Sequence, residues 1–240
     1  INEEDHLRLQ CVKAGFDLDR VWRAVSAIDM ALERQVKMTF SERLGYLTAC
    51  PTNVGTGMRV SVMLHLPALT LKQDIKRMHR AADHMNLAMR GLYGEGTQAY
   101  GDFWQISNQV TLGYSEQDLL GRLKQIVPLV LQYERKTRQL LLEKERSLLD
   151  DKIERALANL RVARQINVEE TMSHLSMLRL GISLGVVGPE VMPIDRLNEL
   201  FIICQPAHLQ KREGKSLTPE ERDVLRASII RERLNTPSQN

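Results

Sequence analysis

The hydrophobic period of this chain changes near residue 145. Before that point some segments alternate apolar and polar residues, as strands do, and others repeat apolar residues every three or four positions, as helices do. From about residue 146 onward every recognisable pattern is helical. The sequence therefore predicts a mixed domain over residues 1–145, followed by an all-helical domain over residues 146–240.

Two alternating segments of the first domain carry ionisable side chains. Residues 4–9 place Glu4 and Arg8 on one face of an expected strand, and residues 59–66 place Arg59 on the face opposite the apolar residues. Shorter strands are expected over 44–49 and 106–112. Helices are expected over 17–38, 70–86, 115–144 with an interruption at Pro128, 148–164, 168–185, 193–204 and 218–234.

The composition excludes several classes of protein. Hydrophobic residues make up 43% and charged residues 26% of the 240 residues, as in an ordinary folded chain. The 33 basic and 30 acidic side chains leave a net charge of +3, which is too small to demand a nucleic-acid or membrane partner. The longest apolar runs fall far short of the roughly 20 residues that a membrane helix needs. We therefore expect no membrane and no direct nucleic-acid partner, and function must come from local sites.

The cysteines and the first residues bear on the context of the chain. Cys11, Cys50 and Cys204 are odd in number and too widely spaced for a Cys-x-x-Cys motif, which argues against a disulfide framework and favours a cytoplasmic location. The chain begins with neither an initiator Met nor the layout of a signal peptide. We interpret it as an excerpt of a longer protein.

Three polar clusters are the candidates for chemistry, at residues 4–8, 50–59 and 90–95. The chain has no Gly-x-x-x-x-Gly-Lys-Ser/Thr loop, no zinc-ligand spacing and no Gly-x-Ser-x-Gly turn. Arginines from separate segments suit a polyphosphate. A nearby carboxylate suits phosphoryl transfer to an arginine guanidinium, which needs a group to accept its proton. The spacing alone leaves a surface ion pair between Glu4 and Arg8 equally open.

The same clusters resemble the signature blocks of the ATP:guanidino phosphotransferase family. The matching blocks are Asn-Glu-Glu-Asp-His-Leu-Arg at 2–8, Cys-Pro-Thr-Asn-Val-Gly-Thr-Gly-Met-Arg at 50–59, Arg-Gly-Leu-Tyr-Gly-Glu at 90–95, and Ile-Ser-Asn-Gln at 106–109. The resemblance covers roughly residues 1–145. It implies an α+β fold, with an antiparallel sheet flanked by helices as the catalytic lobe, followed by the all-helical domain.

The resemblance also implies roles for individual residues. Glu4 and Glu95 would hold and deprotonate the substrate guanidinium, and Cys50 would tune the site electrostatically. ATP, with Mg²⁺ bridging its phosphates, would be the cosubstrate, and no metal site of the protein's own is expected. The residues that would contact ATP are Arg8, Arg59, Val60, Ser61, Val62, Met63, Arg90, Gly91, Leu92, Tyr93, Gly94 and Glu95.

Two features resemble the protein-arginine kinases of this family more than its small-molecule kinases. Residues 92–98 read Leu-Tyr-Gly-Glu-Gly-Thr-Gln where kinases of free arginine and creatine usually have Thr-Arg-Gly-Glu-His-Thr-Glu, so one arginine and one carboxylate are replaced. A free amino acid is then a less natural substrate than a protein side chain. Residues 222–227 fit the Arg-Asp-x-x-Arg-Ala motif that binds phosphoarginine, which would assign that role to Arg222, Asp223, Arg226 and Ala227.

The resemblance finally implies a biological setting. A protein-arginine kinase would mark proteins for degradation by a Clp-type protease in a stress response, under allosteric regulation, with a transcriptional repressor and an activator protein among its partners and with self-association. Two other functions stay open, a free-guanidino kinase and a non-catalytic adaptor that binds phosphoarginine. The family's N-terminal domain, with its Ser-Ser-Arg-x-Arg strand, is not among these 240 residues, and we expect it in the longer protein from which they are an excerpt.

Overall fold

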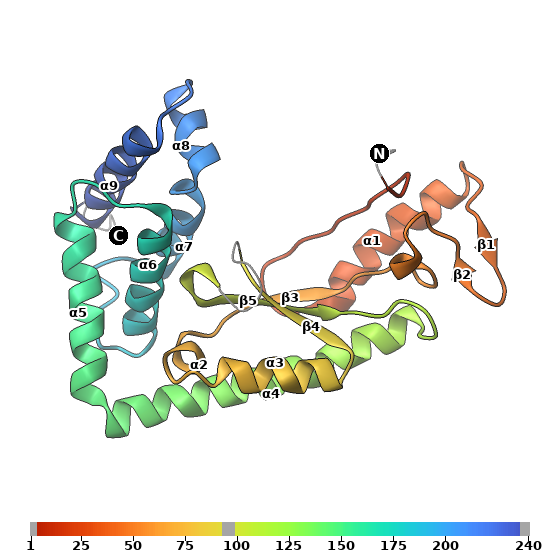
Figure 1. The fold of residues 1–240 in the computed structure, drawn as a ribbon, viewed down its shortest axis with the longest axis horizontal. Coiled ribbons are helices and arrows are strands. Elements are labelled where there is room, and N and C mark those ends of the chain that lie inside the picture. Colours follow the sequence, from red (N-terminus) through yellow and green to blue (C-terminus); the bar gives the residue numbers. More distant parts are fainter. Residues whose placement is uncertain (1–3, 93–98, 236–240) are drawn as a thin grey trace. The chain divides into compact units, whose positions relative to one another are not determined.

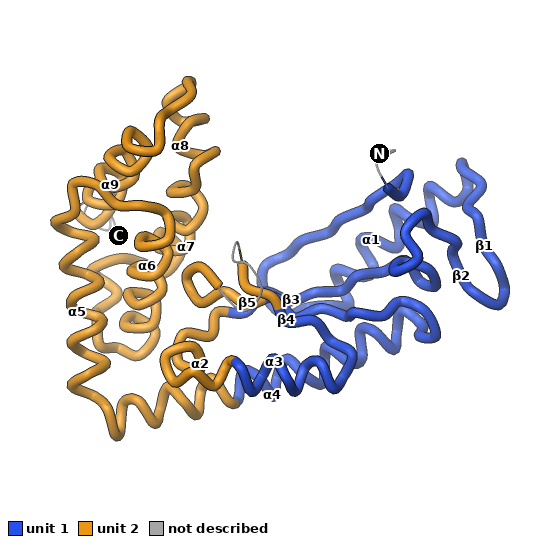
Figure 2. Tube along the Cα trace, in the orientation of Figure 1, with its two compact units in different colours: residues 1–64, 76–89, 105–132 blue, residues 65–75, 90–104, 133–240 orange. Residues whose placement is uncertain are grey.

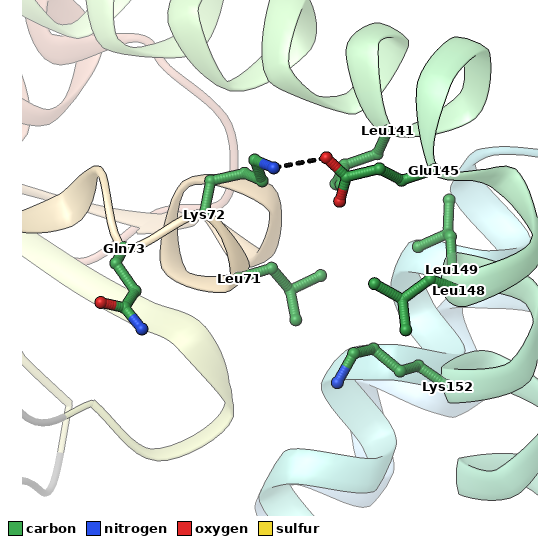
Figure 3. Close-up of a pocket in the computed structure, with 8 residues that line it drawn as sticks. All are labelled: Leu71, Lys72, Gln73, Leu141, Glu145, Leu148, Leu149 and Lys152. Atoms are coloured by element: carbon green, nitrogen blue, oxygen red, sulfur yellow. Dashed lines mark hydrogen bonds and ion pairs between the residues drawn. The ribbon is translucent and has the colours of Figure 1, made fainter.

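The computed structural model describes residues 4–92 and 99–235. The chain divides into two compact units (Figure 2). Unit 1 comprises residues 1–64, 76–89 and 105–132, and unit 2 comprises residues 65–75, 90–104 and 133–240.

The helices and strands follow the predicted mixed-then-helical order (Figure 1). The strands are β1 (Phe40–Ser41), β2 (Gly45–Tyr46), β3 (Ser61–His65), β4 (Leu87–Gly91) and β5 (Phe103–Asn108). The α-helices are α1 (Leu18–Glu33), α2 (Pro67–Leu71), α3 (Ile75–His84), α4 (Glu116–Lys144), α5 (Arg146–Val162), α6 (Val168–Ser183), α7 (Ile194–Ile203), α8 (Pro206–Glu213) and α9 (Pro219–Asn235), and two short 3-10 helices are η1 (Pro51–Asn53) and η2 (Tyr100–Asp102).

The central sheet has the strand order β3-β5-β4, and its hydrogen bonds show antiparallel pairing. At the two ends of the β3 and β5 pair, the Asn108 N–H donates to Val60 O and the Leu66 N–H donates to Asp102 O. Low residue numbers on β3 therefore face high residue numbers on β5. The same holds for β4 and β5, where Gln109 donates to Asn86 O and Leu92 donates to Phe103 O. The predicted antiparallel sheet is confirmed.

Strand β3 has the alternation that the sequence predicted. Val60, Leu64 and Leu66 are buried, whereas Arg59 and Ser61 are exposed. Alternate side chains of a strand point to opposite faces, so the apolar set packs into the core and Arg59 and Ser61 lie on the opposite face.

The strand expected over residues 4–9 is wrong. Residues 4–6 form a bend and residues 7–9 have no regular structure. An isolated extended segment has no partner for its backbone N–H and C=O groups. The alternation of side chains along 4–9 therefore does not create a strand in the described part of the chain.

Two other predictions differ from the structure. The helix expected over 70–86 is split into α2 and α3, because Gln73 has a φ of 58°, which a right-handed helix does not accommodate. Pro128 does not interrupt α4, which runs from Glu116 to Lys144. Pro128 is exposed, so the carbonyl that lacks its helical donor lies where water can satisfy it.

Helix starts follow the capping signals in the sequence. Asp17 accepts a hydrogen bond from the Arg20 N–H at the start of α1. Thr218 and Glu221 cap α9 reciprocally, because the Glu221 N–H donates to the Thr218 hydroxyl and the Thr218 N–H donates to the Glu221 carboxylate. Helix α8 was not predicted from the sequence, although Pro206 at its first position is a recognised start signal.

The core of unit 2 is formed by the helices beyond residue 146 together with short segments from the first part of the chain. Ile153, Leu175 and Leu197 are fully buried in this core, and Ala68 of α2 belongs to the same cluster. Tyr100 and Phe103 pack against it. The compact units therefore divide the chain differently from the predicted boundary at residue 145, which stays a prediction.

Candidate active site

In unit 1 the first polar cluster is attached to the second one through Asp5. The Asp5 carboxylate accepts a hydrogen bond of 2.8 Å from the Ala49 N–H and one of 2.7 Å from the Asn53 side-chain amide. The hydrogen bond from Asn53 lowers the pKa of Asp5 below its ordinary value. These two bonds place residues 4–8 beside the loop that begins at Cys50, across more than forty positions of sequence.

Glu4 and Arg8 form an ion pair. Arg8 Nη2 lies 2.9 Å from Glu4 Oε2, and each side chain is about half exposed, at 54% for Arg8 and 48% for Glu4. Such an exposed pair contributes at most about 1 kcal/mol to the free energy of unfolding. Both groups can therefore exchange this partner for a ligand of the right charge at little cost.

Cys50 stands at the start of η1 and is partly exposed. Its Sγ lies 2.9 Å from the Thr52 hydroxyl. The Thr48 hydroxyl donates to Cys50 O, which holds the backbone of the cysteine from the other side. The thiol is therefore fixed at the mouth of the loop that Asp5 binds, with a hydroxyl group available to it as a hydrogen-bond donor.

Asn108 fixes the start of β3. Its side-chain oxygen accepts a hydrogen bond of 2.8 Å from the Val60 N–H, and its side-chain nitrogen donates to Met58 O at 3.0 Å. Asn108 is 5% exposed, so both bonds are shielded from water. The amide holds the backbone on both sides of Arg59 and leaves the Arg59 side chain exposed.

The predicted ATP contacts on β3 divide between the two faces of the strand. Ser61 and Met63 are exposed beside Arg59, and the Ser61 hydroxyl accepts a hydrogen bond from Gln105. Val60 is buried and Val62 is partly buried on the opposite face. The side chains of these two valines face the core, so only their backbone groups are placed to meet a nucleotide.

The third cluster belongs to unit 2 and is only partly described. Arg90 is exposed, and Gly91 and Leu92 are partly buried at the end of β4. The Leu92 N–H and Leu92 O are both hydrogen-bonded, to Phe103 O and from the Tyr100 N–H. The predicted residues Tyr93, Gly94 and Glu95 lie outside the described residues.

The predicted phosphoarginine residues lie on α9 in unit 2, and they differ in exposure. Arg226 is 1% exposed and donates to Cys204 O, Ile166 O and Asp223 Oδ1, at 2.8, 2.8 and 2.5 Å. Ala227 is also buried, at 1%. Arg222 and Asp223 are partly exposed. Of the four residues, Arg222 and Asp223 are therefore placed to meet a ligand, while Arg226 holds Asp223 and the helix.

Asp5 and Asn108 contribute to the site and were not predicted from the sequence as site residues. Both lie inside the quoted motif blocks, so the block matches carried the signal. Their role is to join segments that are far apart in the chain, which no pattern within one segment reveals.

Comparison with family models assigns the chain to a protein family. The model of the ATP:guanido phosphotransferase C-terminal catalytic domain matches residues 1–137. The chain belongs to the ATP:guanido phosphotransferase family. A second model, the protein-arginine kinase McsB C-terminal domain, matches residues 146–240. The two matches are adjacent and together cover nearly the whole chain.

Curated members of the family are similar along almost the full length of this chain. A protein-arginine kinase from Halothermothrix orenii is 46% identical over 98% of this chain and 67% of its own length. One from Symbiobacterium thermophilum is 48% identical over 98% of this chain and 66% of its own length. The chain spans about two thirds of the length of the curated relatives that it matches.

A solved structure is similar to part of this chain. The duplicated taurocyamine kinase from Schistosoma mansoni, with bound components of a transition-state analogue, is 28% identical, with a TM-score of 0.50 over 64% of this chain and 22% of that chain. Within residues 4–92 and 99–235, no helix is long and apolar enough to cross a membrane.

Proposed function

We propose that the protein containing this chain is an ATP-dependent protein-arginine kinase. The observation that carries the proposal is the tandem match of a guanidino kinase catalytic domain and a protein-arginine kinase C-terminal domain in one chain. Identity of 46–48% with curated protein-arginine kinases supports it. Arg8 and Arg59 are exposed in unit 1 and Arg90 is exposed in unit 2. The family resemblance assigns all three to ATP, and guanidinium groups bind phosphate oxygens.

The proposed step is an in-line phosphoryl transfer. A terminal nitrogen of the substrate guanidinium attacks the γ-phosphorus, the N–P bond forms, and the bond from the γ-phosphorus to the bridging oxygen breaks to release ADP. The nitrogen loses one proton, which Glu4 or Glu95 accepts. Arg8, Arg59 and Arg90 neutralise the charge of the phosphoryl group during transfer.

Mg²⁺ enters this proposal as part of the nucleotide substrate. Mg²⁺ commonly keeps several water ligands and binds through substrate phosphates with one or two carboxylates. The described residues hold no group of three or more His, Cys, Asp or Glu side chains placed to ligate a metal. The MgATP complex supplies charge neutralisation, and the residues of this chain supply binding, orientation and the proton acceptor.

A protein side chain is the proposed phosphoryl acceptor. The Leu-Tyr-Gly-Glu-Gly-Thr-Gln sequence at 92–98 lacks an arginine and a carboxylate that small-molecule kinases usually carry there. A protein-bound arginine presents only its guanidinium, so it needs fewer charged partners than a free amino acid. On α9, Arg222 is proposed to bind the phosphoryl group of a phosphoarginine and Asp223 its guanidinium.

The wider setting is also part of the proposal. From the family resemblance alone, we propose that the protein marks other proteins for a Clp-type protease in a stress response and that it is cytoplasmic. The same resemblance is the basis for proposing allosteric regulation, self-association, and an activator protein and a transcriptional repressor as partners.

Substitution of the two glutamates tests the proposed chemistry. Glu4→Gln and Glu95→Gln keep the shape of the side chain and remove the proton acceptor, so each is expected to slow arginine phosphorylation at least about 100-fold in the complete protein. Glu42→Gln is the control, because Glu42 is an exposed carboxylate of unit 1. Rates equal to the control in both variants would contradict the proposed role.

A further inference from the structure

His65, Ser176 and Asp102 form a hydrogen-bonded chain inside unit 2. Ser176 Oγ lies 2.8 Å from His65 Nε2 and donates to Asp102 Oδ2 at 2.5 Å. A serine hydroxyl has one hydrogen, so the Nε2–H of a neutral His65 must be the donor to Ser176. Burial lowers the pKa of His65 well below its ordinary value, and Arg179 and Arg138 add to this effect, which keeps the ring neutral.

The three residues come from three separate segments. His65 is the last residue of β3, Asp102 is the last residue of η2, and Ser176 lies within α6. Residues 1–137 match the catalytic-domain model, and residues 146–240 match the C-terminal-domain model. Ser176 thus brings one hydroxyl of the C-terminal domain into contact with two side chains of the catalytic domain.

The residues around His65, Ser176 and Asp102 show that this hydrogen-bonded chain lies within the packed core of unit 2. Ser176 is fully buried. The Phe103 ring packs on His65 with centroids 4.9 Å apart and meets Phe201 edge-on at 5.0 Å. A Cβ added to Gly101 would lie 3.0 Å from Met172 O of α6, so the backbone of η2 sits directly on this helix.

Backbone geometry ties the same point to β3. Asp102 has a φ of 58°, and its carbonyl accepts the Leu66 N–H at 2.9 Å. The residue that follows β3 is therefore bonded to the backbone of Asp102, while His65 is bonded to Asp102 through Ser176. At the other end of the strand, Asn108 holds the Val60 N–H.

From these contacts we infer that Ser176 is a positioning residue for the ATP-binding face of β3. The inference rests on the proposed function, in which Arg59, Ser61 and Met63 of this face contact the nucleotide. The strand is fixed at its start by Asn108 and at its end by the chain of His65, Ser176 and Asp102. Because a displacement of about 1 Å at a bound group reduces activity as much as 100-fold, the orientation of this strand must be held at both ends.

The inference differs from a purely structural role in what it predicts for kinetics. A variant that only loses folded protein contributes fewer active molecules, which lowers the apparent kcat and leaves the KM for ATP unchanged. A variant whose folded molecules hold β3 less well binds ATP more weakly, which raises the KM for ATP.

The test compares four forms of the complete protein. Ser176→Ala removes the hydroxyl, and Ser183→Ala is its matched control, because Ser183 lies on the exposed side of α6 and donates only to Arg179 O of the same helix. Asp102→Asn keeps an oxygen that accepts from Ser176, and Asn tolerates a positive φ. The KM for ATP, kcat for arginine phosphorylation, and ATP affinity by calorimetry are measured where circular dichroism shows each form folded.

Ser176→Ala is expected to raise the KM and Kd for ATP about tenfold. Ser183→Ala is expected to stay within about twofold of the wild type, since it keeps the hydrogen-bonded chain intact. Asp102→Asn keeps an acceptor for the Ser176 hydroxyl and is expected to bind ATP more tightly than Ser176→Ala. An unchanged ATP affinity in folded Ser176→Ala would overturn the inference. Absence of arginine phosphorylation in the wild type would overturn the proposed function instead, and the calorimetric comparison would still decide the role of Ser176. A wild type that binds no ATP would overturn both.

Discussion

At the residue scale, Asp102 combines burial, a positive φ and a carboxylate that is held by hydrogen bonds. Burial raises the pKa of Asp102 from 3.8 to about 6. Hydrogen bonds from Ser176 and Thr70 oppose this rise, and the nearby Glu134 carboxylate adds to it. The ionised carboxylate is therefore less favourable in the folded protein than in the unfolded chain.

This shift predicts a pH dependence of stability. Between the unfolded pKa near 4 and the folded pKa near 6, the folded state binds more protons, so stability present at low pH is lost as pH rises through 6. A difference of about two pKa units corresponds to roughly 3 kcal/mol. Asp102→Asn does not titrate, so its free energy of unfolding relative to the wild type is expected to increase by about 2–3 kcal/mol from pH 4 to pH 7.

Urea denaturation across this range measures the effect. A constant difference between the two proteins at every pH would show that the pKa of Asp102 is the same in the folded and unfolded states.

Residues inside a motif can be predicted from the sequence, whereas residues that join distant segments cannot. The charged residues of the site, such as Arg59, were predicted because the motif blocks mark them. Asp5, Asn108 and Ser176 act by joining segments, and a contact between distant segments leaves no periodic signal in either one.

At the element scale, most helices and the main sheet follow from periodicity and capping. Strand β3 and the start of α9 were predicted because alternation and the Thr218 and Glu221 cap are local signals. The segment 4–9 was mispredicted because alternation is necessary for a half-buried strand and a strand also needs a partner. Pro128 was expected to interrupt α4 because proline has no backbone N–H to donate. Pro128 is exposed, so water can satisfy the carbonyl that lacks this donor.

Helix α9 gives a prediction at the same scale. The buried Arg226 bonds α9 to the carbonyls of Ile166 and Cys204, which lie outside that helix. Arg226→Ala leaves these carbonyls and Asp223 without their partner, which is expected to reduce the free energy of unfolding by about 3–5 kcal/mol.

Arg222→Ala is the matched comparison on α9. Arg222 is partly exposed and makes one long contact of 3.5 Å to Leu217 O, so its loss is expected to change stability by less than about 1 kcal/mol. Because Arg222 is proposed to bind the phosphoryl group, Arg222→Ala is expected to weaken the binding of free phosphoarginine. Equal loss of stability in the two variants, measured by denaturant titration, would contradict the assignment of a structural role to Arg226 and a ligand role to Arg222.

At the scale of the whole molecule, sequence domains and compact units do not coincide. Residues 65–75 and 90–104 match the catalytic-domain model and yet fold into the unit that contains the C-terminal helices. A change of hydrophobic period shows where the type of structure changes. It does not show which side chains share a core, and residues such as Ala68 and Phe103 join the helical core for that reason.

The identity of the phosphorylated atom decides whether the protein is a protein-arginine kinase. The complete protein is incubated with MgATP and an unfolded protein substrate, and the product is analysed by ³¹P NMR and by mass spectrometry at neutral pH. A protein-arginine kinase gives phosphate that is bonded to a guanidinium nitrogen of arginine side chains and is lost in acid. Acid-stable phosphate on serine, threonine or tyrosine, or phosphorylation of free arginine with none on protein, would contradict it.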